Sequence, residues 1–279
     1  MKEKQRPVFN YKGNHFQGVS EGGICTSIFC NELDIIFDIG TLPFDYAHIN
    51  NLFVSHAHLD HSAGIPYYIS QRSLRKLKAP RIYVHEAMYE NMQKVIELYS
   101  RMEDFTYAYE LKSVEQKKYY TLGKNTSFMA WPTIHRIPSQ AYTIFDRVNK
   151  LKPEYSETPR EELLELKKKN IPITEERYTP LVSFSGDTRI EGILESKEAL
   201  LSRVLFMECT YLDDKRNIAN AREWGHIHLD EIIAYANEFK NETIVLIHFS
   251  KRYSYKGIRE LLNKKLPDSL QGRVISFIP

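Results

Sequence analysis

The sequence predicts an α/β protein in which helices cover β-sheets, and two observations lead to this prediction. Short runs of β-branched and aromatic residues recur along the chain, and longer stretches with helical periodicity separate many of them. A chain of 279 residues is also long enough for one large α/β domain, or for two small ones. Strands interspersed with helices favour a layered architecture. We therefore expect a single α/β domain over residues 1–279.

The expected strands are short and apolar. By composition and length they cover residues 24–30, 33–39, 52–55, 81–84, 127–131, 141–145, 181–185, 204–208, 243–248 and 274–278. The expected helices cover residues 65–78, 86–101, 190–201, 219–224, 230–239 and 256–264. The composition agrees with a folded protein, because 42% of the residues are hydrophobic and 27% are charged.

Composition and charge say more about where the protein is located than about which molecules it binds. No apolar run approaches the roughly 18–20 residues that span a bilayer, and the charged first six residues lead into no apolar stretch typical of a secretory signal. Cys25, Cys30 and Cys209 are scattered and odd in number, which argues against a disulfide framework and favours the cytoplasm. The formal net charge of +2 neither implies nor excludes nucleic-acid binding.

Residues 147–180 differ from the rest of the chain, because they are rich in charge and contain four prolines. Thr158, Pro159 and Glu161 are typical of a helix start, with Thr158 as the N-cap and Pro159 at the first helical position. A short helix over residues 160–169 should follow. We expect this segment to be an arm inserted into the domain and protruding from it. A surface loop without a role is the alternative.

One short segment carries four potential metal ligands within six residues, namely His56, His58, Asp60 and His61. Imidazole and carboxylate groups are usual ligands of zinc and of neighbouring first-row metals. His56 and His58 are two apart in an extended segment, so they point the same way and can bind one ion. Asp60 and His61 follow where the chain turns into a helix, and they can face a second ion. Core packing does not account for four such residues in this order.

Two ions need more ligands, and three candidates lie further along the chain. His135, Asp187 and His248 each follow or end a predicted strand. A single histidine in such a place is more often an ordinary hydrogen-bonded residue. Taken together, the three complete the ligand set that the first four begin.

This order of ligands resembles the motif series of the metallo-β-lactamase superfamily, from about Gly18 to the end of the chain. Asp38, in a Phe-Asp-Ile-Gly run, matches the early motif whose aspartate orients the metal loop without binding metal. The resemblance implies an αββα sandwich with the metals at one edge between the sheets. It assigns one ion to His56, His58 and His135, the other to Asp60, His61 and His248, and the bridging position to Asp187.

Narrower motifs resemble those of the tRNase Z family, which removes the 3′ trailer of precursor tRNA, and most of all its short plant type. Glu208 and Thr210 match the Glu and Thr of the family's His-Glu-Ala-Thr motif, with Met207 in place of its histidine. His226 matches the histidine of the Gly-His-Ser-Thr motif, and His228 replaces its threonine.

Two further segments point to the same family. Residues 248–253 resemble its His-Phe-Ser-X-Arg-Tyr run. Residues 147–180 fall where the family carries its exosite arm, although the Gly-Pro pair typical of that arm is absent. Homodimers are usual in this family, so the resemblance implies a second copy of the chain as a partner.

The chemistry of phosphodiester hydrolysis suits these positions. Asp60 would hold and deprotonate the attacking water, and His226 would protonate the leaving 3′ oxygen, with Glu208 raising the pKa of His226. Lys251 and Arg252 could neutralise phosphate beside the site. A helix-capping role for His226 and a solvated loop around Lys251 are the alternatives.

The expected cofactors are two divalent metal ions, zinc first and manganese or iron(II) as alternatives, and the expected substrate is precursor tRNA. The densest basic run, residues 72–81, should lie near the rim of the site and attract RNA, or else form a solvated helix face. Two other functions stay open: hydrolysis of a small ester, thioester or cyclic phosphodiester, and a catalytically silent nucleic-acid-binding module. The interval from Asp187 to His248 is too short for a β-CASP-type insertion.

Overall fold

The N-terminal part of the chain builds the first of two β-sheets. The computed structural model describes residues 6–41 and 46–279, so residues 1–5, part of the stretch where no secretory signal is expected, lie outside the described residues. The first sheet has the order β1-β2-β3-β4-β5-β6-β7, with β14 paired to β2. Its strands are β1 (Val8–Tyr11), β2 (Asn14–Gly22), β3 (Cys25–Cys30), β4 (Ile35–Phe37), β5 (Asn51–Phe53), β6 (Arg81–Val84), β7 (Glu110–Ser113) and β14 (Phe249–Ser250).

The second sheet has the order β15-β13-β12-β11-β10-β9-β8. The pairs β9–β10 and β10–β11 are antiparallel, and β11, β12, β13 and β15 run parallel. The parallel strands end at the same edge, which is where side chains from distant parts of the sequence can meet. The strands are β8 (Tyr120–Thr121), β9 (Thr126–Pro132), β10 (Gln140–Leu151), β11 (Thr174–Phe184), β12 (Val204–Glu208), β13 (Thr243–Ile247) and β15 (Val274–Ser276).

Helices connect most of the parallel strands. Among the described residues, none of them is both long and apolar enough to cross a membrane. They are α1 (Leu59–Ser62), α2 (Ile65–Leu74), α3 (Glu86–Met102), α4 (Arg160–Lys168), α5 (Ile190–Leu194), α6 (Lys197–Leu201), α7 (Ile218–Trp224), α8 (Leu229–Ala234) and α9 (Tyr255–Lys265), with short 3-10 turns η2 (Pro153–Tyr155) and η3 (Asp214–Arg216).

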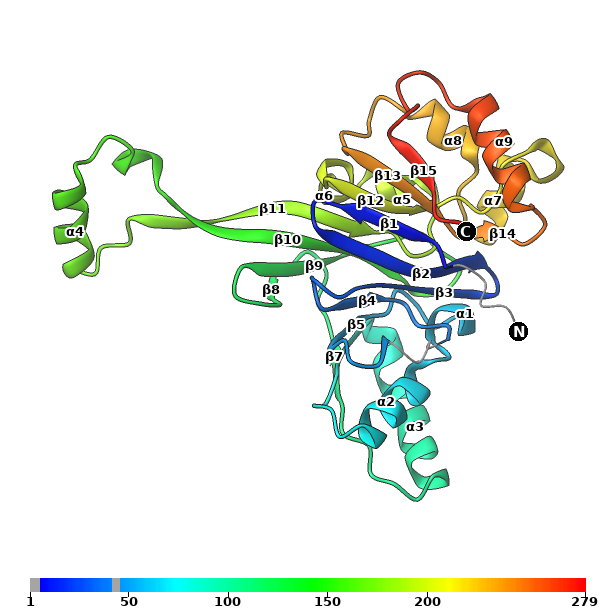
Figure 1. Cartoon of the computed structure of the whole chain (residues 1–279), viewed down its shortest axis with the longest axis horizontal. Helices are drawn as coiled ribbons and strands as arrows, with labels where there is room; N and C mark the ends of the chain where they lie inside the picture. The colour runs from blue at the N-terminus through cyan, green and yellow to red at the C-terminus, as the bar shows by residue number, and fades with distance from the viewer. Residues whose placement is uncertain (1–5, 42–45) are drawn as a thin grey trace.

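Aromatic rings fill the space between the two sheets. Phe37 of the first sheet stacks on Phe184 of the second with ring centroids 4.8 Å apart, and Phe53 meets Phe128 at 4.9 Å. All four rings are fully buried, and each contributes about 1.5–3 kcal/mol of hydrophobic stabilisation. Helices α2 and α3 lie on the outer side of the first sheet, while α8 and α9 lie on that of the second (Figure 1). The expected αββα sandwich is therefore confirmed.

Four helix predictions need correction. The predicted helix 230–239 ends at Ala234. The predicted helix 190–201 is two helices, because Ser196 accepts a hydrogen bond from the Ala199 amide and starts α6. The predicted helix 65–78 ends at Leu74, and Lys76 adopts a positive φ of 55°. In the arm, the predicted cap is wrong: Pro159 is the N-cap of α4, without a side-chain hydrogen bond.

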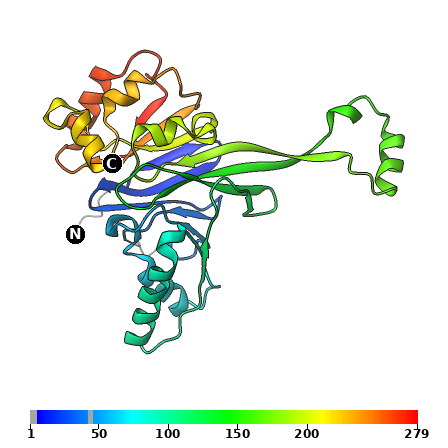
Figure 2. The same ribbon diagram turned by 180° about the vertical axis from the view of Figure 1, so that it is seen from behind.

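Strands β10 and β11 continue beyond the sheet as a two-stranded ribbon. Figures 1 and 2 show this ribbon extending away from the body of the protein with α4 at its end. No residue of α4 is buried. The ribbon leaves the sheet at a bulge, since Ile144 pairs with Val182 and Phe145 with Pro180, which leaves Leu181 as the extra residue. A bulge bends and twists the strand that carries it.

Candidate metal centre

Asp38 fixes the loop that carries the first candidate ligands. Its buried carboxylate accepts hydrogen bonds from the Ser55 amide at 2.6 Å and the Ser55 hydroxyl at 2.7 Å. It also accepts one from Nδ1 of His61 at 2.6 Å. These three bonds tie β4 to both ends of the loop between β5 and α1. The loop therefore has one defined shape, as the resemblance implied for this aspartate.

A first cluster of donor atoms lies at the edge between the sheets. Nδ1 of His58 is 3.0 Å from Nε2 of His56 and 3.3 Å from Nε2 of His135. Oδ2 of Asp187 is 3.7 Å from the His56 nitrogen and 4.0 Å from the His135 nitrogen. Donors held about 2.1 Å from one ion at tetrahedral angles are about 3.4 Å apart. The four donor atoms fit a single ion.

A second cluster adjoins the first. Nε2 of His61 and Nε2 of His248 are 3.3 Å apart. Oδ2 of Asp60 lies 3.5 and 3.6 Å from these nitrogens, and Oδ1 of Asp187 lies 3.4 and 3.3 Å from them. The spacing again matches a single ion. All seven residues singled out in the sequence thus meet at one place.

Asp187 connects the two clusters through its two carboxylate oxygens. Oδ2 faces the first cluster and Oδ1 faces the second. Oδ1 is buried and has no hydrogen-bond partner within the described residues. A buried carboxylate oxygen without a donor is costly, and a cation at each cluster would remove that cost. The donor set therefore fits a pair of metal ions.

The outer nitrogens of the histidines have partners that sequence reasoning did not single out for this purpose. Nδ1 of His135 donates to the Gly225 carbonyl at 2.9 Å, and Nδ1 of His248 to the Thr210 hydroxyl at 3.0 Å. His61 donates to Asp38 in the same way. A carbonyl or carboxylate can only accept, and the Thr210 hydroxyl donates its own proton to Glu208 at 2.7 Å. Each Nδ1 therefore carries a proton, and Nε2 is the nitrogen that faces the cluster.

Electrostatics favours the metal-binding form of the first cluster. Burial lowers the pKa of His56, His58 and His135, and the neighbouring rings lower it further, so these rings are neutral near pH 7. His61 differs. Burial lowers its pKa too, but the carboxylates of Asp187 and Asp38 more than offset this and raise it well above its usual value. A bound cation would compete with that proton.

His226 pairs with a buried carboxylate next to the clusters. Its Nδ1 donates to Oε1 of Glu208 at 2.9 Å and lies 3.8 Å from Asp187. Burial opposes the charge on His226, but Glu208 outweighs this and raises the pKa of His226 to about 9. Glu208 is itself held by the amides of Thr188 and Ile227 at 2.9 and 3.2 Å. A cationic His226 can donate a proton from Nε2.

His228 performs the capping role that His226 could have had. Its ring accepts a hydrogen bond from the Asp230 amide at 3.1 Å, and Glu231 closes the capping box at the start of α8. His228 is 1% exposed, and its Nε2 donates to the Asp213 carbonyl at 3.2 Å. The two histidines, two residues apart in the chain, thus have different partners.

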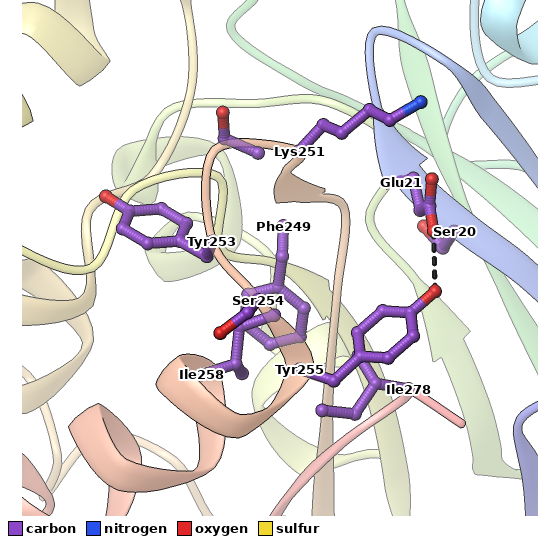
Figure 3. Close-up of a pocket in the computed structure, with 10 residues that line it drawn as sticks. Ser20, Glu21, Phe249, Lys251, Tyr253, Ser254, Tyr255, Ile258 and Ile278 are labelled. Atoms are coloured by element: carbon purple, nitrogen blue, oxygen red, sulfur yellow. Dashed lines mark hydrogen bonds between the residues drawn. The ribbon is translucent and has the colours of Figure 1, made fainter.

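Lys251 and Arg252 follow β14 in the loop after His248. Lys251 is exposed and lines the mouth of a cavity of about 300 Å³ with Tyr253 and Tyr255, whose hydroxyl donates to Glu21 (Figure 3). The guanidinium of Arg252 lies 5.4 Å from the ring centroid of Tyr211, and its Nε donates to the Ser250 hydroxyl at 3.0 Å. Both cations are therefore on the surface, three and four residues after His248 in the chain.

The basic run 72–81 contains one residue that is not available to RNA. Arg72 is 1% exposed, and its guanidinium donates to the carbonyls of Ala47, Ile49 and Lys78. It stabilises the turn after α2. The expectation of a basic face for RNA is wrong for this arginine, because its guanidinium is buried and donates its hydrogen bonds to backbone carbonyls.

Comparison with known proteins agrees with this geometry. The model of the family described as anti-Pycsar protein Apyc1 matches residues 32–152. The protein named tRNase Z TRZ1 of Arabidopsis thaliana is 35% identical over 276 residues, which cover 98% of each chain. The solved structure of the metallo-β-lactamase fold protein YhfI from Bacillus subtilis has a TM-score of 0.61 at 16% identity and covers 92% of this chain and 93% of its own. That of human tRNase Z, short form, has a TM-score of 0.58 at 18% identity, covering 84% and 92%.

The layered fold is the metallo-β-lactamase fold, and it brings together His and Asp clusters that could hold metal ions. The full-length similarity to the plant protein is more specific. The chain belongs to the tRNase Z family, and it is an endoribonuclease.

Proposed function

We propose that the chain removes the 3′ trailer of precursor tRNA by hydrolysis at a centre of two divalent metal ions. One observation carries the proposal: Asp187 directs one oxygen to each donor cluster, and the buried Oδ1 has no hydrogen bond among the described residues. A shared carboxylate of this kind serves two neighbouring ions, and two-ion centres suit displacement at phosphorus. Membership of the tRNase Z family adds RNA as the substrate class.

When bound, the ions would supply Lewis acidity at the scissile phosphate. His56, His58 and His135 would hold one ion, and Asp60, His61 and His248 the other, with Asp187 between them. Sets rich in imidazole with a carboxylate favour zinc, and manganese or iron(II) are the alternatives.

The chain's own residues would position the water and move the protons. Asp60 would orient the attacking water and accept its proton. Burial raises the pKa of Asp60, but the adjacent His248 and His61 hold it far below its usual range, so the carboxylate is ionised at neutral pH. His226 would donate the proton that the leaving 3′ oxygen needs, and Glu208 would keep His226 protonated.

Binding of the RNA would use surfaces outside the centre. Lys251 and Arg252 are exposed cations on the loop after His248, and they suit phosphates next to the cleaved bond. The arm, residues 147–180, would grip the body of the tRNA as an exosite, since its helix α4 lies far from the sheets (Figure 1).

A second copy of the chain is the proposed protein partner. An apolar groove of about 330 Å³ lies between α1, α2 and α3, and its lining includes the exposed side chains of Leu59, Val95 and Tyr99. A homodimer would cover these side chains. Sedimentation of the purified protein tests this: a mass of one chain at micromolar concentration would contradict it.

The cytoplasm is the proposed compartment. Cys25, Cys30 and Cys209 are free thiols and all are buried. Burial raises the pKa of each of them, which keeps them as unreactive thiols in a reducing environment.

Mapping of the 3′ ends formed from a precursor tRNA tests the main proposal. Purified protein with metal should release the trailer at one bond, and a chelator should stop the reaction. The second candidate function, hydrolysis of a small ester, thioester or cyclic phosphodiester, predicts the opposite: turnover of a small substrate and an intact precursor.

A further inference from the structure

Trp224 is exposed beside the metal centre. It ends α7 and is 46% exposed, whereas the other tryptophan of the chain, Trp131, is 1% exposed and buried in the second sheet. A single exposed apolar side chain is common and proves nothing by itself. The informative observation is that the residue after Trp224 is hydrogen-bonded to a proposed metal ligand.

The backbone next to Trp224 is fixed to a proposed metal ligand. Gly225 adopts φ of 75°, and its carbonyl accepts the 2.9 Å hydrogen bond from His135. A Cβ at Gly225 would lie 2.8 Å from Nδ1 of His135, so only glycine fits there. The ring of His226, the next residue, is 5.3 Å from that of His135. Trp224 therefore sits at a fixed distance from the reacting groups.

An arginine lies against the ring of Trp224. Arg136 follows His135, and its guanidinium lies 4.6 Å from the centroid of the Trp224 ring system. Within residues 6–41 and 46–279, no carboxylate lies within 4.0 Å of Arg136. By contrast, Arg222 of α7 is paired with Glu191 and Glu231 at 2.7 and 2.8 Å. The charge of Arg136 is therefore available to an anion.

We propose that Trp224 and Arg136 form a stacking platform for an unpaired nucleotide next to the cleaved bond. The proposal rests on the proposed function. Indole faces and guanidinium planes are the groups on which unpaired bases stack, and the arginine adds attraction for the adjoining phosphate. The end of a precursor tRNA supplies such a nucleotide, because the bases beyond the acceptor stem are not paired.

The fluorescence of Trp224 provides a direct test. The probe is a single-stranded RNA pentamer with phosphorothioate linkages, titrated into the full-length, metal-loaded protein. Stacking on Trp224 should quench the emission, while the buried Trp131 is shielded from the RNA. Trp224→Phe should abolish the quench and keep pentamer binding, measured by anisotropy of a labelled pentamer, because phenylalanine also stacks.

Truncation variants measure the contribution to binding. Trp224→Ala should weaken pentamer binding and raise KM for precursor tRNA by about 5–100-fold, the range found for loss of one base stack. Arg136→Gln should have a smaller effect in the same direction. The matched control is Tyr235→Ala, which removes another exposed aromatic side chain, 41% exposed after α8, and should change neither quantity.

Two outcomes would overturn the platform. Equal pentamer affinity of Trp224→Ala and the wild type would show that no base stacks there. An equal loss on precursor tRNA and on bis(p-nitrophenyl) phosphate would show that Trp224 acts only by supporting His135. If the pentamer quenches Trp224 but no precursor tRNA is cut, the platform stands and the proposed function fails.

Discussion

The metal centre and the arm are built on opposite principles. In the centre, donor atoms from four separate segments lie 3.0–4.0 Å apart, and His61, His135 and His248 each have a second hydrogen bond that fixes the ring. In the arm, no residue of α4 is buried, and its side-chain contacts include exposed ion pairs such as Lys168–Glu165. Such pairs contribute little to stability. The difference shows that the donor atoms are held in place by contacts from several segments, whereas the helix that we propose to bind RNA projects from the body with no residue buried.

Asp187→Ala should produce the largest effect, because both clusters lose a ligand at once. We expect precursor cleavage to fall by more than about 10³-fold, which corresponds to roughly 4 kcal/mol in the transition state. Metal analysis should show fewer than two ions per chain. The variant Asp187→Asn keeps the shape and is the matched comparison. Full activity in Asp187→Ala would contradict the bridging role.

His226→Ala should reduce kcat on precursor tRNA by about 10²–10⁴-fold while metal content stays unchanged. A p-nitrophenyl phosphodiester should suffer much less, because its leaving group needs no proton. Glu208→Ala should show the same selectivity more mildly. His228→Asn is the control, since asparagine also caps a helix, and it should retain most activity. Equal losses on both substrates would remove His226 from the role of acid.

The pH profile should separate the acid from the ligands. Glu208 raises the pKa of His226 to about 9, so His226 is protonated below that pH and the rate should fall as pH rises through it. Bound cations lower this pKa, which places the alkaline limb at or below pH 9. In Glu208→Gln the limb should move to lower pH. A limb that does not move would show that another group causes it.

Removal of the arm should affect binding alone. Asp146 and Thr179 face each other in the ladder, so an Asn-Gly turn can join them and replace residues 147–178. We expect KM for precursor tRNA to rise by about 10–100-fold, with kcat on a p-nitrophenyl phosphodiester maintained, because remote contacts supply binding. Loss of both activities would mean that the fold was damaged, which circular dichroism would detect.

The smallest effect should come from a substitution at the tip of the arm. Leu164 of α4 is 50% exposed, so Leu164→Ala should change the free energy of unfolding by no more than about 0.5 kcal/mol. The counterpart in the body is Phe184→Ala, which removes a fully buried ring stacked on Phe37 and should cost about 3–5 kcal/mol. Denaturant unfolding measures both. Similar losses would show that the arm has a core of its own.

The sequence predicted the apolar strands well and the polar strands poorly. β6 and β12 were predicted at their observed bounds, because continuous apolar runs identify a strand buried on both faces. β2 was missed, since it alternates buried residues such as Phe16 with polar ones and includes two glycines. β7, a polar edge strand, was missed for the same reason.

At the site, the spacing of residues in the sequence identified the candidate ligands but not the groups that hydrogen-bond to them. Spacing alone predicted the cluster from His56 to His61, because the ligands are neighbours in the chain. The hydrogen bond from His135 to Gly225 joins residues 90 apart, and it had no signal in the sequence. The pairing of His226 with Glu208 was expected from the resemblance, whereas the capping role of His228 became visible only in the fold.

The bulge at Leu181 is the place where the direction of the arm can change independently of the body. A bulge bends the strand that carries it. Insertion or deletion of a single amino acid there would therefore change the direction in which the ribbon leaves the sheet, and with it the position of α4. Asp187 follows the same strand, three residues after Phe184, so it lies on the body side of the bulge. If the arm grips tRNA as proposed, such a change would alter which RNA shapes the protein binds without removing any donor atom of the candidate metal centre.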